Sequence, residues 1–558
     1  MTAPADLAFV NGAVYTVDPA RPRAQAVAVR EGRVVAVGSD DDVRELLGPA
    51  TDVIDLKGRM LLPGFQDAHV HPPSSGLEML RCNLSTAYSL PDYRRIVAEY
   101  AAGHPDEPWI LGGGWSMDVF PGGNPAKDPL DQIVTDRPVY LTSRDGHSAW
   151  VNSKALEMAN VTRDTPDPAD GVIVRGADGE VWGTLHEGAM RLVGELVPED
   201  TIDDWIAGLR VAQEYLHALG ITAWQDAIVG LDRVYPTFDA YLQFARDGEL
   251  TARVIGALWW DRYRGGEQID DLLAARERGS VGRFAATSVK IMQDGVIENF
   301  TAGMLEPYLD AEGNPTTNRG KSFVDPEELK AHVTRLDAEG FQVHFHALGE
   351  RAVREALDAI EHARRTNGMN DLRHHLAHLQ VVNPADVPRF KVLGVVANAQ
   401  PLWAQNEGQM LNLTIPFLGP ERSGWQYPFG SLARAGAMLA FGSDWSVSSP
   451  NPLEEMHVAV NRTGFPDQIY APNSDTTDEP FLPEEAVDLP TAIAAFTAGS
   501  AYVNHLDDVT GTIEAGKLAD LVVLDRDLFA HPLTEIYAAK VELTLIEGER
   551  VYADEDFA

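Results

Sequence analysis

Residues 61–72 read Leu61-Leu62-Pro63-Gly64-Phe65-Gln66-Asp67-Ala68-His69-Val70-His71-Pro72. The apolar part of this run is typical of a short buried strand, and Pro72 is a turn signal at its end. Because side chains two residues apart point to the same face of a strand, the imidazoles of His69 and His71 converge. The pair predicts half of a divalent-metal site, although two ordinary polar histidines would satisfy this stretch taken alone.

The middle of the chain alternates apolar runs with longer helical stretches, which predicts βα units. We assign eight strands, the number that closes a (β/α)8 TIM barrel of the α/β class, to residues 61–69, 221–226, 252–259, 287–293, 342–347, 375–379, 395–400 and 438–444. A Gly-, Pro- and Trp-rich stretch of about residues 72–200 separates the first strand from the second. We interpret it as an insertion that covers the site.

The two ends of the chain have a different pattern, with short strands separated by turn signals such as Asn11-Gly12 and Glu31-Gly32. Neither end is a convincing domain by itself. We therefore expect residues 1–62 and 505–558 to form one composite β-sandwich domain, and residues 63–504 to form the barrel with its insertion.

Composition narrows the possible partners and the cellular compartment. The net charge of −39 argues against nucleic acid or an anionic membrane as a partner, because both bind cationic surfaces. Cys82 is the only cysteine, which excludes an internal disulfide and fits a reducing cytoplasm. The sequence predicts neither a signal peptide nor a membrane span, and a homodimer is the default assembly.

Ionisable residues occupy matching positions on five of the expected strands. Since catalytic residues of a barrel come from the carboxyl ends of several strands, six side chains are expected to meet at one mouth: His69, His71, Lys290, His346, His378 and Asp444. Neutral imidazoles and a carboxylate are good ligands for a borderline divalent ion, zinc first.

Lys290 has two possible roles within its apolar strand. A desolvated lysine beside cations has a lowered pKa, and its amine then reacts with CO₂ to form a carbamate that is able to bridge two metals. The alternative is a lysine that reaches the barrel rim or pairs with Asp294.

Other polar residues on the same strands are expected to have supporting roles. His344 and His374 share strand faces with His346 and His378, but they lie farther from the carboxyl ends. His375 points to the opposite face of its strand and is expected to be structural. Asp226 ends the second strand, where capping is the expected role.

The ligand pattern resembles the binuclear set of the amidohydrolase superfamily, and residues 63–71 and 511–524 resemble its opening and returning segments. Four motifs, three in the insertion and the last at the fifth barrel strand, resemble the N-substituted formamide deformylase-like branch, amidohydrolase family 3: Gly114-Trp115-x-x-Asp118, Asp136-Arg137-Pro138-Val139, residues 145–156 (DGHSAWVNSKAL) and His346-Ala347-x-Gly349. Glu350 replaces an expected Asp at the position that caps the next helix, so no ligand is affected.

The resemblance implies a metal-dependent amidohydrolase that cleaves the C–N bond of a small N-acyl or N-formyl amide. It implies one or two Zn²⁺ ions, bridged by carboxylated Lys290 where there are two, with Asp444 as general base and then general acid. His147 would donate to the substrate oxyanion or, alternatively, fix the fold of the insertion. Trp115 would pack against the apolar side of the substrate.

Two alternatives stay open at this point. The same metal site would also suit a carboxylic ester, a carbamate or a cyclic amide, because ligands alone do not choose among these bonds. A non-catalytic barrel scaffold is an alternative of another class. Such a scaffold should lack several ligands, whereas this chain retains all six.

Overall fold

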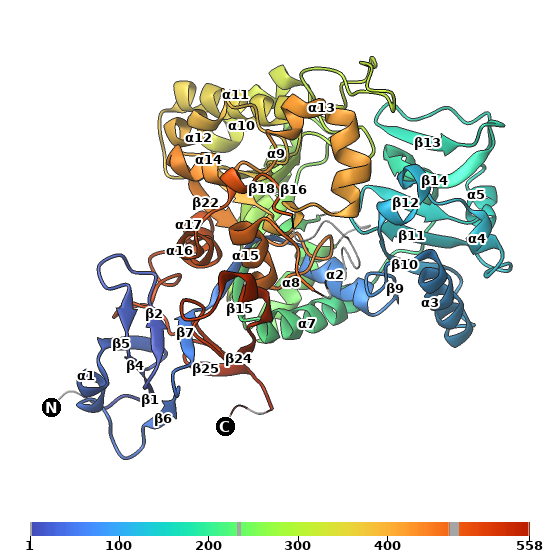
Figure 1. The fold of residues 1–558 in the computed structure, drawn as a ribbon. Helices are drawn as coiled ribbons and strands as arrows, with labels where there is room; N and C mark the ends of the chain where they lie inside the picture. Colours follow the sequence, from blue (N-terminus) through green and yellow to red (C-terminus); the bar gives the residue numbers. More distant parts are fainter. Residues whose placement is uncertain (1–2, 232–235, 467, 469–478, 556, 558) are drawn as a thin grey trace.

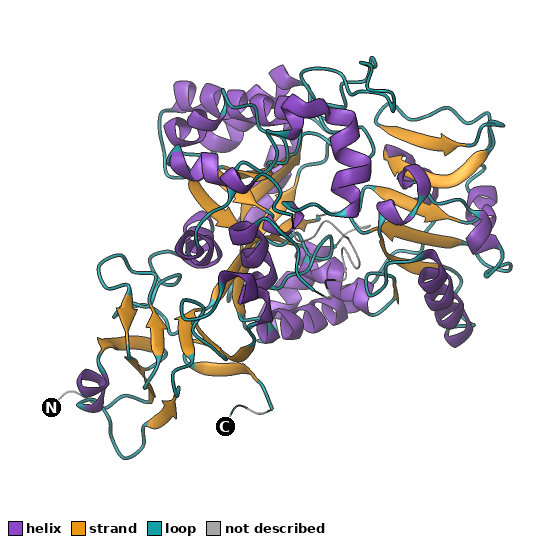
Figure 2. Cartoon of the chain, viewed as in Figure 1, coloured by secondary structure: helices purple, strands orange, loops and turns teal. Residues whose placement is uncertain are grey.

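The computed structural model describes residues 3–231, 236–466, 468, 479–555 and 557. A parallel barrel surrounded by helices occupies the middle of the molecule (Figure 1). Two β-rich units flank it, one built from both chain ends and the other from the insertion (Figure 2). The N- and C-termini both lie on the chain-end unit (Figure 1).

The barrel contains the eight expected strands: β8 (Phe65–Val70), β15 (Ile221–Val229), β16 (Arg253–Trp259), β18 (Phe284–Met292), β19 (Gln342–Ala347), β20 (His375–His378), β21 (Val396–Ala399) and β22 (Met438–Phe441). They pair in parallel in the order β22-β21-β20-β19-β18-β16-β15-β8. The backbone N–H of Asp444, three residues after β22, donates to the carbonyl of His69 in β8 over 2.7 Å, so the segment that follows the last strand contacts the first strand near its carboxyl end. The predicted TIM-barrel fold is confirmed.

Amphipathic helices cover the outside of the barrel: α7 (Ile202–Ala218), α8 (Thr237–Arg246), α9 (Ile269–Arg278), α10 (Pro326–Ala338), α11 (Glu350–Asn367), α12 (Val387–Leu393), α14 (Phe429–Arg434), α15 (Pro452–Asn461) and α16 (Leu489–Ala494). In α11, Val353, Leu357 and Ile360 recur at helical spacing and are fully buried in the main core. Burial of such stripes against the strands holds the barrel rigid around its mouth.

The first expected strand is two strands in the structure, which corrects the prediction of a single strand over residues 61–69. β7 (Met60–Pro63) belongs to the chain-end unit and β8 to the barrel, and the chain passes from one sheet to the other at Gly64. A Cβ at Gly64 would lie 2.5 Å from the Thr222 side chain, so only glycine allows this close passage. Both strands are fully buried, and hydrophobic pattern alone does not show the break.

The chain-end unit consists of two sheets. One has the order β5 (Arg33–Gly38), β4 (Ala26–Arg30), β1 (Leu7–Val10) and β6 (Asp52–Asp55). The other has the order β25 (Glu549–Ala553), β24 (Val541–Ile546), β23 (Leu521–Leu524), β7, β2 (Ala13–Tyr15) and β3 (Arg23–Ala24), so β7 joins strands from opposite ends of the chain. Arg253 of β16 pairs with Asp520 and Glu547 and fastens this unit to the barrel.

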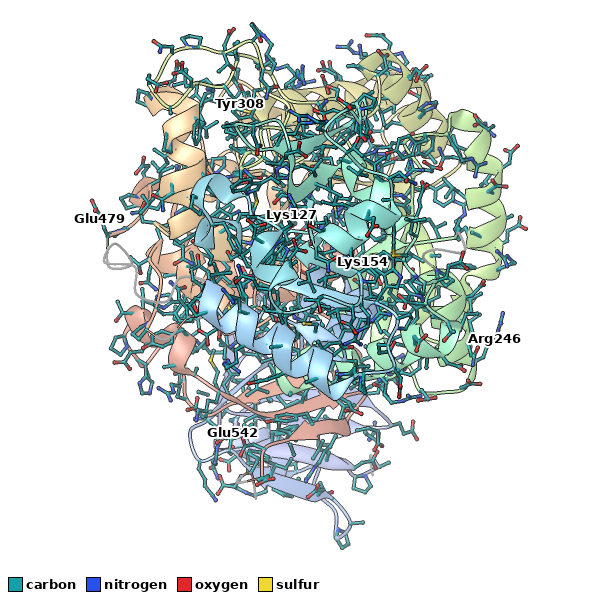
Figure 3. The ribbon with its side chains drawn as sticks, turned by 90° about the vertical axis from the view of Figure 1, so that its right-hand side faces the viewer. Lys127, Lys154, Arg246, Tyr308, Glu479 and Glu542 are labelled. Atoms are coloured by element: carbon teal, nitrogen blue, oxygen red, sulfur yellow. The ribbon has the colours of Figure 1, made fainter. Side chains whose placement is uncertain are left out.

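The insertion builds a sheet of its own, in the order β13 (Gly171–Arg175), β14 (Val181–Glu187), β12 (Ser148–Val151), β11 (Val139–Ser143), β10 (Ile110–Trp115) and β9 (Cys82–Asn83). Its helices include α2 (Pro72–Met79), α3 (Leu90–Gly103) and α5 (Ser153–Met158). Seen from its own side, the insertion, with Lys127 and Lys154, lies in front of the barrel (Figure 3). No helix in the described part of the chain is both long and apolar enough to cross a membrane.

Candidate active site

Three predicted ligands form a tight cluster where the first and eighth strands end. The ligand atoms of His69, His71 and Asp444 all lie within 4.8 Å of one another. Asp444 Oδ1 is 2.9 Å from His71 Nε2 and 3.2 Å from His69 Nε2. Asp444 has a φ of +54°, a left-handed conformation that costs a residue other than glycine about 1–3 kcal/mol and that is concentrated at functional sites.

The other predicted ligands surround this cluster. Lys290 Nζ is 3.4 Å from His69 Nε2, and His378 Nδ1 is 3.8 Å from Asp444 Oδ2. The His346 ring is centred 4.5 Å from the His378 ring. The structure thus brings all six side chains to one mouth, and their binding of metal stays a prediction.

The donor set fits a divalent metal ion. Among the described residues, neither ring nitrogen of the buried His378 has a hydrogen-bond partner, and buried polar atoms in native proteins rarely lack one. Burial lowers the pKa of His69 to about 3 and holds the pKa values of His346 and His378 well below the usual 6.5. These rings are therefore neutral, the form that ligates a metal.

The pKa values of Asp444 and Lys290 are both lowered, but for different reasons. Burial raises the pKa of Asp444, but the neighbouring histidines, above all His69, outweigh burial and hold this pKa well below 3.8. Burial lowers the pKa of Lys290 to about 7, against the opposing attraction of Asp444 and Asp226. Lys290 is only 2% exposed, so a large part of its population carries a neutral amine near pH 7.

Two residues orient the ligands from behind. His344 Nε2 lies 2.8 Å from His69 Nδ1, which leaves Nε2 of His69 facing Asp444 and Lys290. Asp67 accepts hydrogen bonds from the backbone of His69 at 2.9 Å and from Ser443 Oγ at 2.6 Å, and so ties the first strand to the eighth. Sequence reasoning missed Asp67, although its place two residues before His69 was a signal.

The remaining histidines and Asp226 have structural contacts. His374 Nε2 pairs with Asp337 at 2.8 Å, away from the cluster. The ring of His375 is centred 4.0 Å from that of His344. Asp226 accepts hydrogen bonds from Tyr241 Oη at 2.7 Å and from the backbone of Ile228 at 2.9 Å.

The insertion contributes His147 to the mouth. Its ring is centred 5.3 Å from that of His346, and its Nδ1 donates to Glu187 Oε1 over 2.7 Å. Burial lowers the pKa of His147, but the Glu187 carboxylate more than compensates and raises it to about 9. Glu187 also accepts a hydrogen bond from Thr301 Oγ1 at 3.1 Å. No motif surrounds Glu187, and sequence reasoning did not find it.

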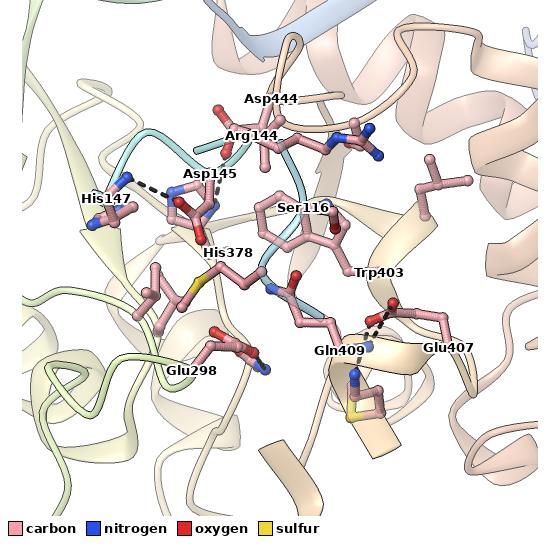
Figure 4. A pocket seen from close by; sticks show the side chains of 18 of the residues that line it. Ser116, Arg144, Asp145, His147, Glu298, His378, Trp403, Glu407, Gln409 and Asp444 are labelled. Atoms are coloured by element: carbon pink, nitrogen blue, oxygen red, sulfur yellow. Dashed lines mark hydrogen bonds and ion pairs between the residues drawn. The ribbon is translucent and has the colours of Figure 1, made fainter. Parts of the chain in front are cut away.

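A pocket lies between the barrel mouth and the insertion (Figure 4). The space between its walls, including the part that opens to solvent, is about 880 Å³. His147, His378 and Asp444 line it together with apolar and aromatic side chains: Met117, Leu348, Leu402, Trp403, Met410 and Tyr427. The Trp115 indole also borders it, but the side chain is fully buried in the core of the insertion and donates to the carbonyl of Leu141 over 2.9 Å. Contact of Trp115 with a substrate stays a prediction.

Comparison with known proteins agrees with this geometry. The family model described as the amidohydrolase family matches residues 52–552, a range that includes the cluster of His69, His71 and Asp444 and the paired strands β7 and β23. The chain belongs to the amidohydrolase family. The predicted family is therefore confirmed.

Relatives of this amidohydrolase match over nearly their whole length. The chain is 31% identical to the protein LONG AFTER FAR-RED 3 of Arabidopsis thaliana, covering 98% of this chain and 92% of the relative. It is 26% identical to the N-substituted formamide deformylase of Arthrobacter pascens, covering 98% of both. An uncharacterized metal-dependent hydrolase of Pyrococcus furiosus has a similar structure, with a TM-score of 0.69 and 27% identity over 93% of this chain and 99% of that one.

Proposed function

We propose that this amidohydrolase hydrolyses the C–N bond of a small N-acyl or N-formyl amide with the help of one or two zinc ions. The observation that carries the proposal is the meeting of His69, His71 and Asp444, with their neighbours Lys290, His346 and His378, beside a pocket that His346, His378 and Asp444 line. The similarity to a formamide deformylase over nearly the whole chain supports an N-formyl or related amide.

The six side chains named above would hold the metal, with Lys290 as a carbamate in a two-metal site. In forming that carbamate, the neutral Lys290 amine bonds to the carbon of CO₂ and releases one proton. When bound, the metal supplies a more acidic water and polarises the carbonyl of the substrate.

Side chains of the protein transfer the protons during hydrolysis. Asp444 is ionised because of its low pKa, so it accepts a proton from the attacking water while the water oxygen bonds to the carbonyl carbon. Asp444 then passes this proton to the amide nitrogen as the C–N bond breaks, and an acid and an amine leave. His147, protonated and held by Glu187, donates to the carbonyl oxygen as negative charge develops on it.

A hydrolysis screen tests the proposal. Formamides, N-acyl amino acids, esters and lactams are offered to the zinc-loaded protein with and without a chelator, and we expect formamides or N-acyl compounds to be hydrolysed fastest and only without chelator. Asp444→Asn should keep its zinc and lose at least about 10³-fold in kcat, because it can no longer accept the proton. Preferred hydrolysis of esters or lactams, or near wild-type turnover by zinc-loaded Asp444→Asn, would contradict the proposal.

A further inference from the structure

Glu298 is a buried carboxylate in the wall of the active-site pocket. It lies in the loop after β18 and is 7% exposed. Its Oε1 accepts a hydrogen bond from Thr414 Oγ1 at 2.6 Å and a long one from Gln380 Nε2 at 3.4 Å. None of the ion pairs among the described residues includes Glu298, whereas most of the other buried acidic side chains at the mouth pair with a histidine.

The charges that face the pocket do not supply a counter-ion for Glu298. Asp145, also in the lining, adds negative charge, whereas burial raises the pKa of Glu407 to about 8 and leaves that carboxyl mostly neutral near pH 7. The two cations among the described lining residues have other partners: His147 pairs with Glu187, and Arg144 donates to the backbone of the insertion. In Figure 4 the side chains of Arg144 and Glu298 lie on opposite sides of the pocket. Among the residues that the structure describes, the Glu298 side of the pocket is therefore acidic without an internal cation.

The walls beside Glu298 suit a positively charged ligand. Burial raises the pKa of Glu298, because an ionised carboxylate is costly away from water, and a cation brought by a ligand would offset the cost of ionising it. Trp403 and Tyr427 line the same pocket and offer aromatic faces, which attract cations. Trp403 also stacks on the candidate ligand His378, with ring centroids 5.5 Å apart.

We propose that this amidohydrolase selects substrates that carry a cationic group, such as a protonated amine, and that Glu298 binds this group. The choice of bond rests on the proposed amide hydrolysis, whereas the recognition of a cation rests on Glu298 and its surroundings alone. The ligand class is thus a small amide with a positive charge on the part of the molecule remote from the scissile bond.

A matched pair of ligands tests the charge preference without any reaction. Choline and 3,3-dimethyl-1-butanol have the same shape, but only choline is charged, and neither carries an amine that would ligate zinc. We expect calorimetry on the zinc-loaded protein to show choline binding roughly tenfold more tightly. Glu298→Gln should reduce this preference to about twofold or less, because the amide oxygen still accepts from Thr414 while the charge is gone.

A control variant separates Glu298 from the general charge of the protein. Glu454→Gln changes a carboxylate on α15 that accepts from Asn451 and does not line the pocket, so the preference should persist. Both variants change the net charge of −39 by one, so the overall field is matched. Equal binding of the two ligands by the wild type, or an undiminished preference in Glu298→Gln, would overturn the assignment.

A pair of substrates distinguishes this proposal from the proposed reaction. N-formyl-1,4-diaminobutane is protonated at neutral pH, and N-formylpentylamine is its neutral counterpart. We expect kcat/KM to favour the cationic formamide in the wild type and the ratio to fall roughly tenfold in Glu298→Gln. Hydrolysis of both at equal rates, with no preference in binding, would overturn the role of Glu298 alone. A preference for choline without hydrolysis of any amide would overturn the amide reaction alone.

Discussion

Glu187→Gln removes one charge and keeps the shape of the side chain that holds His147. In the wild type the Glu187 carboxylate, 2.7 Å from His147 Nδ1, raises the pKa of His147 from 6.5 to about 9. At about 1.4 kcal/mol per pKa unit, this shift corresponds to about 3 kcal/mol of interaction. In the variant burial is the main remaining influence, so we expect the pKa of His147 to fall below 6.5.

The sign of the pH dependence follows from the raised pKa. The stability that His147 contributes is fully present below pH 6.5 and is lost as the pH rises through about 9. Between these values the metal-free wild type should therefore lose up to about 3 kcal/mol more unfolding free energy than Glu187→Gln. Urea-unfolding midpoints of both proteins across this range measure the difference. Glu195→Gln, which breaks an exposed pair with Arg191, is the control and should follow the wild type.

The kcat of Glu187→Gln tests the pairing of His147 with Glu187 independently of stability. With zinc bound, we expect Glu187→Gln to lower kcat by about 10²-fold near pH 7.5, because His147 then donates to the oxyanion as a neutral ring. Parallel stability curves for wild type and variant would refute the charge pairing. A kcat close to that of the wild type would refute the catalytic use of His147.

Three further predictions concern the metal and the contact between domains. His344→Phe removes the hydrogen bond to His69 Nδ1, so zinc affinity, measured by competition with a chromogenic chelator, should fall about 10- to 100-fold; unchanged affinity would show that His344 does not orient the ligand. Arg253→Met leaves Asp520 buried without its partner and should cost about 3–5 kcal/mol in urea unfolding, and a loss below about 1 kcal/mol would contradict this. Removal of metal by a chelator should abolish hydrolysis and lower the Tm, and added zinc should restore both; activity that persists in metal-free protein would exclude a metal role.

Much of the barrel could be predicted because its strands are buried on both faces and alternate with amphipathic helices. All eight strands were predicted close to their observed positions. Only the first differed in nature, because the expected single strand is two strands that belong to different sheets. The break at Gly64 depends on contact with Thr222, a residue far along the chain, so no local pattern indicates it. The pairing of β7 with β23 was foreseen only as a general association of the two chain ends.

The active site likewise contains residues that the sequence predicts and residues that it does not. The six candidate ligands could be predicted because each lies on or just after an apolar strand, and parallel strands bring their carboxyl ends to one mouth. Glu187 and Glu298 could not, because each is a single acidic residue at a strand end or in a loop. Their roles depend on partners that only the fold brings near, His147 for Glu187 and Thr414 for Glu298.

We propose above all that His69, His71 and Asp444 hold a metal ion with the help of Lys290, His346 and His378. Anomalous diffraction at the zinc edge, on crystals of protein that contains at least one equivalent of zinc, tests it most directly. We predict a peak bonded to His69, His71 and Asp444 at about 2.0–2.2 Å. An anomalous map without a peak at these residues, or with zinc bound only elsewhere, would contradict the account.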